Sequence, residues 1–228
     1  MSAAAAARPG GHVLRFWETT VGKKAIMALT GIALFAFVVG HLLGNLQVYS
    51  GRDKLNDYGR LLHHMPALLW GSRIGLLICV GLHIWATVKL AVKKNAARPV
   101  GYSKWKPTVS TYASRTMYWS GPIVLAFLIY HILDLTLGRT NPQFVEGDVY
   151  NNVVTGFSNP LVSGFYIIAM LLLGMHLYHG LWSMFQTMGA AHPKYTGILR
   201  LGATLFAILI VVGNISIPVA VLTGLVHL

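Results

Sequence analysis

Long apolar stretches alternate with short polar segments along the whole chain. Five stretches have the ~20 residues that a helix needs to cross the ~30 Å hydrocarbon core of a bilayer. They cover residues 25–48, 67–90, 115–137, 161–186 and 198–226. Each is predicted to be a helix, because lipid offers no hydrogen-bond partner to an open backbone. The pattern predicts an all-α membrane protein with five transmembrane helices.

The composition agrees with this fold class. Hydrophobic residues make up 55% of the 228 residues and charged residues only 11%, with a mean hydropathy of +0.59. A soluble domain of this size carries more charge on its surface. The single cysteine, Cys79, excludes an intrachain disulfide and a cysteine-based zinc cage.

Basic residues are unevenly distributed between the predicted helices. The net charge is +12, and most Lys and Arg residues lie in the N-terminal tail and in the second and fourth connections. This distribution indicates membrane orientation and not nucleic-acid binding. We predict residues 1–24 to be a cytoplasmic tail, without the features of a signal peptide. Residues 25–228 form the transmembrane domain, and the C-terminus lies outside.

Each of the first four apolar stretches contains a histidine deep in apolar sequence. These residues are His41, His83, His131 and His176. Ionisable side chains are costly inside a membrane, so they are functional candidates by default. The alternative is a neutral imidazole that forms a hydrogen bond between helices, as Ser or Asn does. Their occurrence in four consecutive stretches favours a functional set.

The depths of these histidines group them into two pairs. At ~1.5 Å per residue, His41 and His131 each lie ~24 Å from the cytoplasmic ends of their helices. His83 lies ~10 Å and His176 ~15 Å from the corresponding ends. A structural zinc site needs four ligands around one point, which two levels do not provide. Haem iron instead takes two axial ligands on opposite faces, and imidazole suits this role.

Glycines occur close to three of the four histidines. Small residues make room for a porphyrin between helices, although they also serve close helix packing. The glycines concerned are Gly40, Gly44, Gly75, Gly81, Gly174 and Gly180.

Two parts of the sequence resemble a known family. One is GKKAIMALTGIALFAFVVGHLLGNLQVYSG, followed by LNDYGRLLH, and the other is GMHLYHGLWSMFQTMG in the fourth stretch. They resemble the di-haem cytochrome b anchor of succinate:quinone oxidoreductases (succinate dehydrogenase and fumarate reductase), in its single-subunit, five-helix form. The resemblance covers residues 15–226. In the second and third stretches it depends mainly on the histidine positions.

The resemblance implies a specific set of cofactors. It implies two haem b groups in a bundle of the first four helices. The outer haem is ligated by His41 and His131, and the inner haem by His83 and His176. Electrons pass from an iron–sulfur subunit through both haems to a membrane quinone, either menaquinone or ubiquinone.

The resemblance also implies partner subunits. The chain has no flavin fingerprint and no cysteine set for iron–sulfur clusters, so succinate chemistry belongs to a flavoprotein subunit and an iron–sulfur subunit. No catalytic residue is expected in this chain. The implied location is a bacterial-type cytoplasmic (inner) membrane.

Further residues are candidates for contacts with haem. His179 is turned ~60° from His176 on a helix, and we expect it to support the inner haem without ligating its iron. Haem propionates favour cationic or hydrogen-bonding partners. The candidates at the inner ends of the helices are Lys24, Arg115, Trp182 and Gln186. Lys24 and Arg115 are equally suited to simple anchoring at the membrane interface.

A second group of residues is a candidate quinone site near the outer haem. Quinone reduction consumes protons, which His and carboxylate side chains transfer. The candidates are Asp57, Arg60, His63, His64 and Arg73. Arg73 is also a candidate partner of the outer haem. An inner site formed by Trp182, Gln186 and Arg115 is the competing prediction. Some relatives carry a carboxylate where this chain has Gly174, so a proton path through that position is not expected.

Two other functions fit the same features. One is a di-haem cytochrome b anchor for a different respiratory dehydrogenase, of hydrogenase or formate dehydrogenase type. The subunits that co-purify with the chain distinguish this anchor from that of a succinate:quinone oxidoreductase. The other is a haem-free transporter that uses the intramembrane histidines as proton relays, which a reduced-minus-oxidised absorption spectrum distinguishes.

Overall fold

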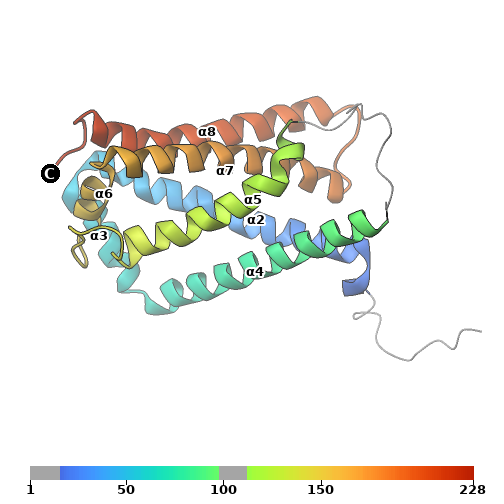
Figure 1. The fold of residues 1–228 in the computed structure, drawn as a ribbon, viewed down its shortest axis with the longest axis horizontal. Helices are drawn as coiled ribbons and strands as arrows, with labels where there is room; N and C mark the ends of the chain where they lie inside the picture. Colours follow the sequence, from blue (N-terminus) through green and yellow to red (C-terminus); the bar gives the residue numbers. More distant parts are fainter. Residues whose placement is uncertain (1–15, 98–111) are drawn as a thin grey trace, which may run out of the picture.

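The computed structural model describes residues 16–97 and 112–228 as helices with short connections (Figure 1). In chain order they are α2 (Thr20–Asn45), the 3₁₀ helix η1 (Leu46–Ser50), α3 (Arg52–His63), α4 (Pro66–Ala96), α5 (Tyr112–His131), the π-helix η2 (Ile132–Thr136), α6 (Val149–Phe157), α7 (Pro160–Thr187) and α8 (Thr196–Leu222). Residues 1–15, most of the predicted tail, lie outside the described residues.

Five helical segments of the described chain are long and apolar enough to cross a membrane. They are Thr20–Ser50, Pro66–Ala96, Trp119–Thr136, Pro160–Thr187 and Thr196–Leu222. The predicted all-helical membrane fold is therefore confirmed. The first helix begins at Thr20, before the predicted residue 25, because the Thr19 hydroxyl accepts a hydrogen bond from the Gly22 amide and caps the helix.

Two short helices were not predicted. Helices α3 and α6 lie within polar segments that the hydrophobic pattern assigns to connections. Gly51, with φ +96°, turns the chain from η1 into α3. The Asp148 carboxylate caps α6 by accepting a hydrogen bond from the Asn151 amide. Both helices lie at the end of the bundle that carries the C-terminus (Figure 1).

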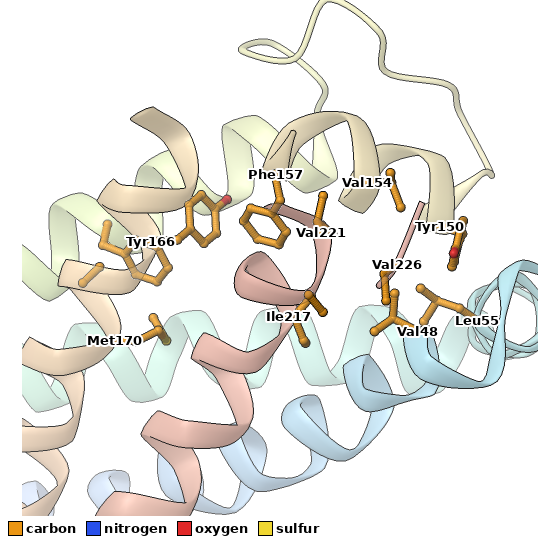
Figure 2. Packing of buried hydrophobic residues seen from close by; sticks show 13 residues of the cluster. Val48, Leu55, Tyr150, Val154, Phe157, Tyr166, Met170, Ile217, Val221 and Val226 are labelled. Atoms are coloured by element: carbon orange, nitrogen blue, oxygen red, sulfur yellow. The ribbon is translucent and has the colours of Figure 1, made fainter. Parts of the chain in front are cut away.

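We call this end the outer end and the opposite end the inner end, after the predicted orientation. The buried apolar cluster of the described chain lies toward the outer end, where η1, α3, α6, α7 and α8 meet (Figure 2). Val48 and Leu55, among its most buried members, come from η1 and α3. The short helices therefore complete the core at this end.

A polar network joins α3 to α6. Asn56 on α3 is buried, donates to the Asp148 carboxylate at 2.9 Å and accepts from the Tyr150 amide at 3.0 Å. Arg52 forms an ion pair with the same carboxylate. Burial works to raise the pKa of Asp148, but the hydrogen bonds from Arg52, Asn56 and the Asn151 amide outweigh it, so its pKa is lowered.

The long helices pack in an open arrangement. Helix α4 packs along α2, α5 packs along α7, and α7 packs along α8. Figure 1 shows α4 at one edge of the bundle, with α7 and α8 at the other. Of the α4 residues, all of which the structure describes, Ala86 alone is buried. Helix α4 is thus fixed on one side by α2, and also meets α3 at its outer end.

Candidate functional site

The structure brings two of the predicted histidines together near the outer end. His41 lies on α2, and His131 is the last residue of α5. Their ring centroids are 5.7 Å apart, and the ring planes are nearly perpendicular at 89°. His41 also stacks on Phe37, one helical turn earlier, with centroids 5.3 Å apart. Helix α2, which carries His41, packs along α4, whereas α5, which carries His131, packs along α7.

The other two histidines lie together nearer the inner end. His83 projects from α4 and His176 from α7, with ring centroids 6.3 Å apart and planes inclined at 55°. Helix α4 packs along α2, whereas α7 packs along α5 and α8. The structure therefore groups the four side chains as the depth argument does, in two pairs at two levels.

The geometry and surroundings of these pairs fit two bis-histidine haem sites. With about 2 Å for each metal–imidazole bond, two imidazoles on opposite sides of one iron place their centroids about 6 Å apart. The observed separations agree with this value. The Nδ1 atoms of His131 and His176 are buried without a hydrogen-bond partner in the described chain.

Aromatic side chains surround His131. The rings of Phe127 and Tyr166 lie 5.7 and 6.0 Å from the His131 ring, centroid to centroid. The Tyr166 hydroxyl donates to Asp134 at 3.0 Å, and the Thr140 hydroxyl donates to the other carboxylate oxygen at 2.7 Å. Asp134 lies on η2 and is only 1% exposed. The carboxylate thereby fixes the ring that packs against His131.

Sequence analysis missed Asp134 and its partner Tyr166. The available signal was an acidic residue inside the third apolar stretch, three positions after His131. The rule that selects intramembrane histidines applies equally to a carboxylate. Thr30 was also missed. It lies on α2, and its hydroxyl oxygen is 3.2 Å from Nδ1 of His83.

The glycines near the histidines have two different surroundings. A side chain at Gly44 would meet the Tyr58 ring at 2.7 Å, and one at Gly174 would meet Val211 at 2.3 Å. Gly44 lets α3 pack closely on α2, and Gly174 lets α8 pack closely on α7. Close packing accounts for both glycines without a porphyrin. At Gly40, Gly75, Gly81 and Gly180, the described chain places no atom within 4 Å of the corresponding position, apart from the adjacent residues and the backbone of the same helix.

A cavity of about 240 Å³ lies at the inner end between α2 and α7. It is lined by Lys24, Met27, Ser183, Gln186 and Thr187. The structure thus brings together two of the predicted propionate partners, Lys24 and Gln186. The cationic and hydroxyl groups of this lining suit an anion.

The remaining candidates for haem contacts lie elsewhere. Trp182 is buried, and the Arg200 guanidinium of α8 lies 4.6 Å from the centroid of its ring. Arg115 is exposed and His179 is partly buried. The Arg73 guanidinium lies over the ring of Trp70, a residue of the same helix, at 5.1 Å.

The other quinone candidates lie on α3 or at its end. Asp57 and Arg60 are exposed and form an ion pair with each other. His63 and His64 are exposed, and Nδ1 of His63 lies 2.8 Å from the Gly59 carbonyl oxygen. The opposite face of α3 presents Tyr58 to the outer end of α2, against Gly44. Tyr58 therefore contacts the helix that carries His41.

The sequence matches a family model described as succinate dehydrogenase/fumarate reductase transmembrane subunit, over residues 93–215. The match covers more than half of the chain. The chain belongs to this family. No match was found among curated proteins or among solved structures.

Family membership defines the chain in broad terms. It is a multi-pass membrane subunit of the kind that anchors an oxidoreductase complex. The matched region includes His131 and His176. It begins in the last turns of α4 and therefore includes neither His41 nor His83.

Proposed function

We propose that this chain is the di-haem membrane anchor of a succinate:quinone oxidoreductase. Its role is to pass electrons from an iron–sulfur subunit to a membrane quinone. The observation that carries the proposal is the arrangement of four histidines in two facing pairs at two levels. Each pair would supply two imidazoles to hold one haem.

The chain's own residues account for haem binding and orientation. His83 and His176 hold the inner haem, and His41 and His131 hold the outer haem. Each bound haem supplies a site that takes up and releases one electron. Lys24 and Gln186, on the inner cavity, are suited to bind propionates of the inner haem. His179, one turn from His176, supports the same haem from the side.

Quinone reduction is assigned to the outer end. Asp57, Arg60, His63 and His64 lie on the exposed face of α3, where protons are available from water. Tyr58 on the opposite face lies against α2 at Gly44, three residues beyond His41. We include it in the quinone site together with Arg73. The competing inner location is the cavity lined by Lys24 and Gln186.

The partner subunits are assigned to the inner end. Helix α4 ends there with Lys89, Lys93 and Lys94, and α8 begins there near Lys194 and Arg200. A flavoprotein subunit carries the dicarboxylate site. An iron–sulfur subunit would dock on this basic face, next to the level at which His83 and His176 would hold the inner haem. The basic charge also fits a cytoplasmic inner end and a cytoplasmic-membrane location.

Haem stoichiometry tests the proposal most directly. The complex is purified with its co-purifying subunits, and its haem is measured as the pyridine haemochrome. The expected value is two haem b groups per chain, reducible by succinate. One haem per chain, or none, overturns the proposal. Two haems with hydrogenase or formate dehydrogenase subunits would leave the haem sites standing but reject the succinate assignment.

The quinone location needs a separate comparison. An outer set (Tyr58→Phe, Arg60→Gln) and an inner set (Lys24→Gln, Gln186→Leu) are assayed for succinate:quinone activity, with haem content monitored. The outer assignment predicts that the outer set raises the quinone KM while both haems remain. A raised KM in the inner set alone transfers the site to the inner cavity.

A further inference from the structure

Thr30 connects helix α2 to the imidazole of His83 on α4. Its side chain is almost completely buried, with 6% of its surface exposed. The hydroxyl oxygen lies 2.7 Å from the Ile26 carbonyl, four residues earlier on the same helix. It also lies 3.2 Å from Nδ1 of His83. Both contacts are within hydrogen-bond distance.

The chemistry of a hydroxyl group determines the direction of these two bonds. A threonine hydroxyl has one proton to donate and two lone pairs that accept. The backbone carbonyl of Ile26 only accepts, so the hydroxyl proton is directed to it. The hydroxyl oxygen then accepts a hydrogen bond from the Nδ1–H group of His83. The neutral His83 ring is therefore protonated on Nδ1, and its Nε2 lone pair is free to bind a metal.

His83 differs in this respect from its partner and from one outer histidine. In the described chain, the buried Nδ1 atoms of His176 and His131 have no hydrogen-bond partner. A hydrogen bond from the second nitrogen of a metal-bound histidine fixes the ring and increases the basicity of the ligand. Of these three histidines, His83 alone has such a bond from its Nδ1 atom.

We propose that Thr30 is a positioning residue that orients His83 and lowers the midpoint potential of the inner haem. This inference rests on the proposed di-haem function. A more basic imidazole favours the oxidised, more positive iron over the reduced iron. Removal of the hydroxyl therefore raises the inner potential and leaves the outer potential unchanged.

Three variants separate hydrogen bonding from packing. Thr30→Val keeps the branched shape and removes the hydroxyl, whereas Thr30→Ser keeps the hydroxyl and removes a methyl group. Thr87→Val is the matched control, because the Thr87 hydroxyl donates to the His83 backbone carbonyl at 2.8 Å. It removes a hydroxyl one helical turn from the same histidine without removing the bond to its ring.

The measurement is a redox titration of the two haem absorption bands in the purified complex, together with haem content. Thr30→Val is expected to change the one-electron reduction equilibrium constant of the inner haem about tenfold. This corresponds to a midpoint potential about 59 mV higher. Thr30→Ser and Thr87→Val are expected to keep the wild-type potentials. Selective loss of the inner haem in Thr30→Val, with retention in Thr30→Ser, also supports the proposal.

Other outcomes overturn it. An unchanged inner potential in Thr30→Val shows that the hydrogen bond has no role. An equal effect in Thr30→Ser or in Thr87→Val shows that packing or helix geometry is responsible. A wild-type protein without two haems rejects the proposed function itself, which haem content reveals before any variant is compared.

Discussion

At the outer end the histidine pair lies beside a continuous apolar core, whereas at the inner end it lies between loosely connected helices. The outer His131 contacts Phe127 and Tyr166, which both belong to that core. The inner His83 lies on α4, where Ala86 alone is buried. The outer pair is thus oriented mainly by aromatic packing around His131, whereas at the inner pair His83 is oriented by the hydrogen bond with Thr30.

The largest expected effect is complete loss of one haem. His83→Ala and His176→Ala are each expected to remove the inner haem, and His41→Ala and His131→Ala the outer haem. Each iron keeps a single strong ligand after the change. Redox titration of membranes from each variant measures the surviving component, and His179→Ala is the control that keeps both. If His83→Ala and His131→Ala remove the same component, the pairing is wrong.

The next largest effect concerns the outer core. Asp134→Ala removes the acceptor of the Tyr166 and Thr140 hydroxyls in a buried site. A buried hydroxyl without a partner costs roughly 1–3 kcal/mol. We expect a lower unfolding temperature in detergent and a disturbed outer haem. Tyr166→Phe, which removes one donor and leaves the carboxylate bonded to Thr140, should cost less. Equal disturbance of both haems would contradict the local role of Asp134.

Two glycines that flank His176 provide a matched pair. Gly174→Ala places a methyl group against Val211 of α8, and overpacking of this kind costs roughly 1–3 kcal/mol. The methyl group of Gly180→Ala meets no atom of another helix within 4 Å in the part of the chain that the structure describes. It should leave helix packing intact and lower only the inner haem content, if porphyrin lies beside Gly180. Thermal unfolding and haem content, measured on both variants, check this; unchanged haem in Gly180→Ala removes that glycine from the site.

The smallest effect is expected in the α3–α6 network. The pKa of Asp148 is lowered in the folded protein, so its ionised form stabilises the fold at neutral pH. That stabilisation is lost as the pH falls below the ordinary carboxyl value of 3.8 toward the lowered pKa. Asp148→Asn keeps a side-chain oxygen that can cap α6 but removes the ion pair with Arg52, so it should lower stability only slightly at neutral pH and should flatten this pH dependence. Thermal unfolding at pH values from about 2 to about 7, a range that extends below the ordinary carboxyl value, tests it.

The sequence predicted the five long helices well, because their boundaries and lengths follow from apolar runs and helix rise. It also indicated which histidines share a level, since depth depends only on position along a helix. The sequence left Gly44 and Gly174 open between porphyrin space and close helix packing, because the neighbours that show the packing, Tyr58 and Val211, come from other helices. Contacts between helices, such as Thr30 with His83, have no signature in the spacing of residues within one helix.

The attachment of α4 through α2 has a consequence for biogenesis. Helices in lipid associate through packing and hydrogen bonds, without the hydrophobic drive present in water. Helix α4 packs along α2 on one side and bears His83 toward α7 on the other. If His83 and His176 hold the proposed inner haem, binding of that haem would tie α4 to α7 after membrane insertion. On the proposed function, a cell that makes this chain faster than it makes haem would accumulate a form in which α4 is held by α2 and α3 alone, and the abundance of the subunit would then follow the haem supply.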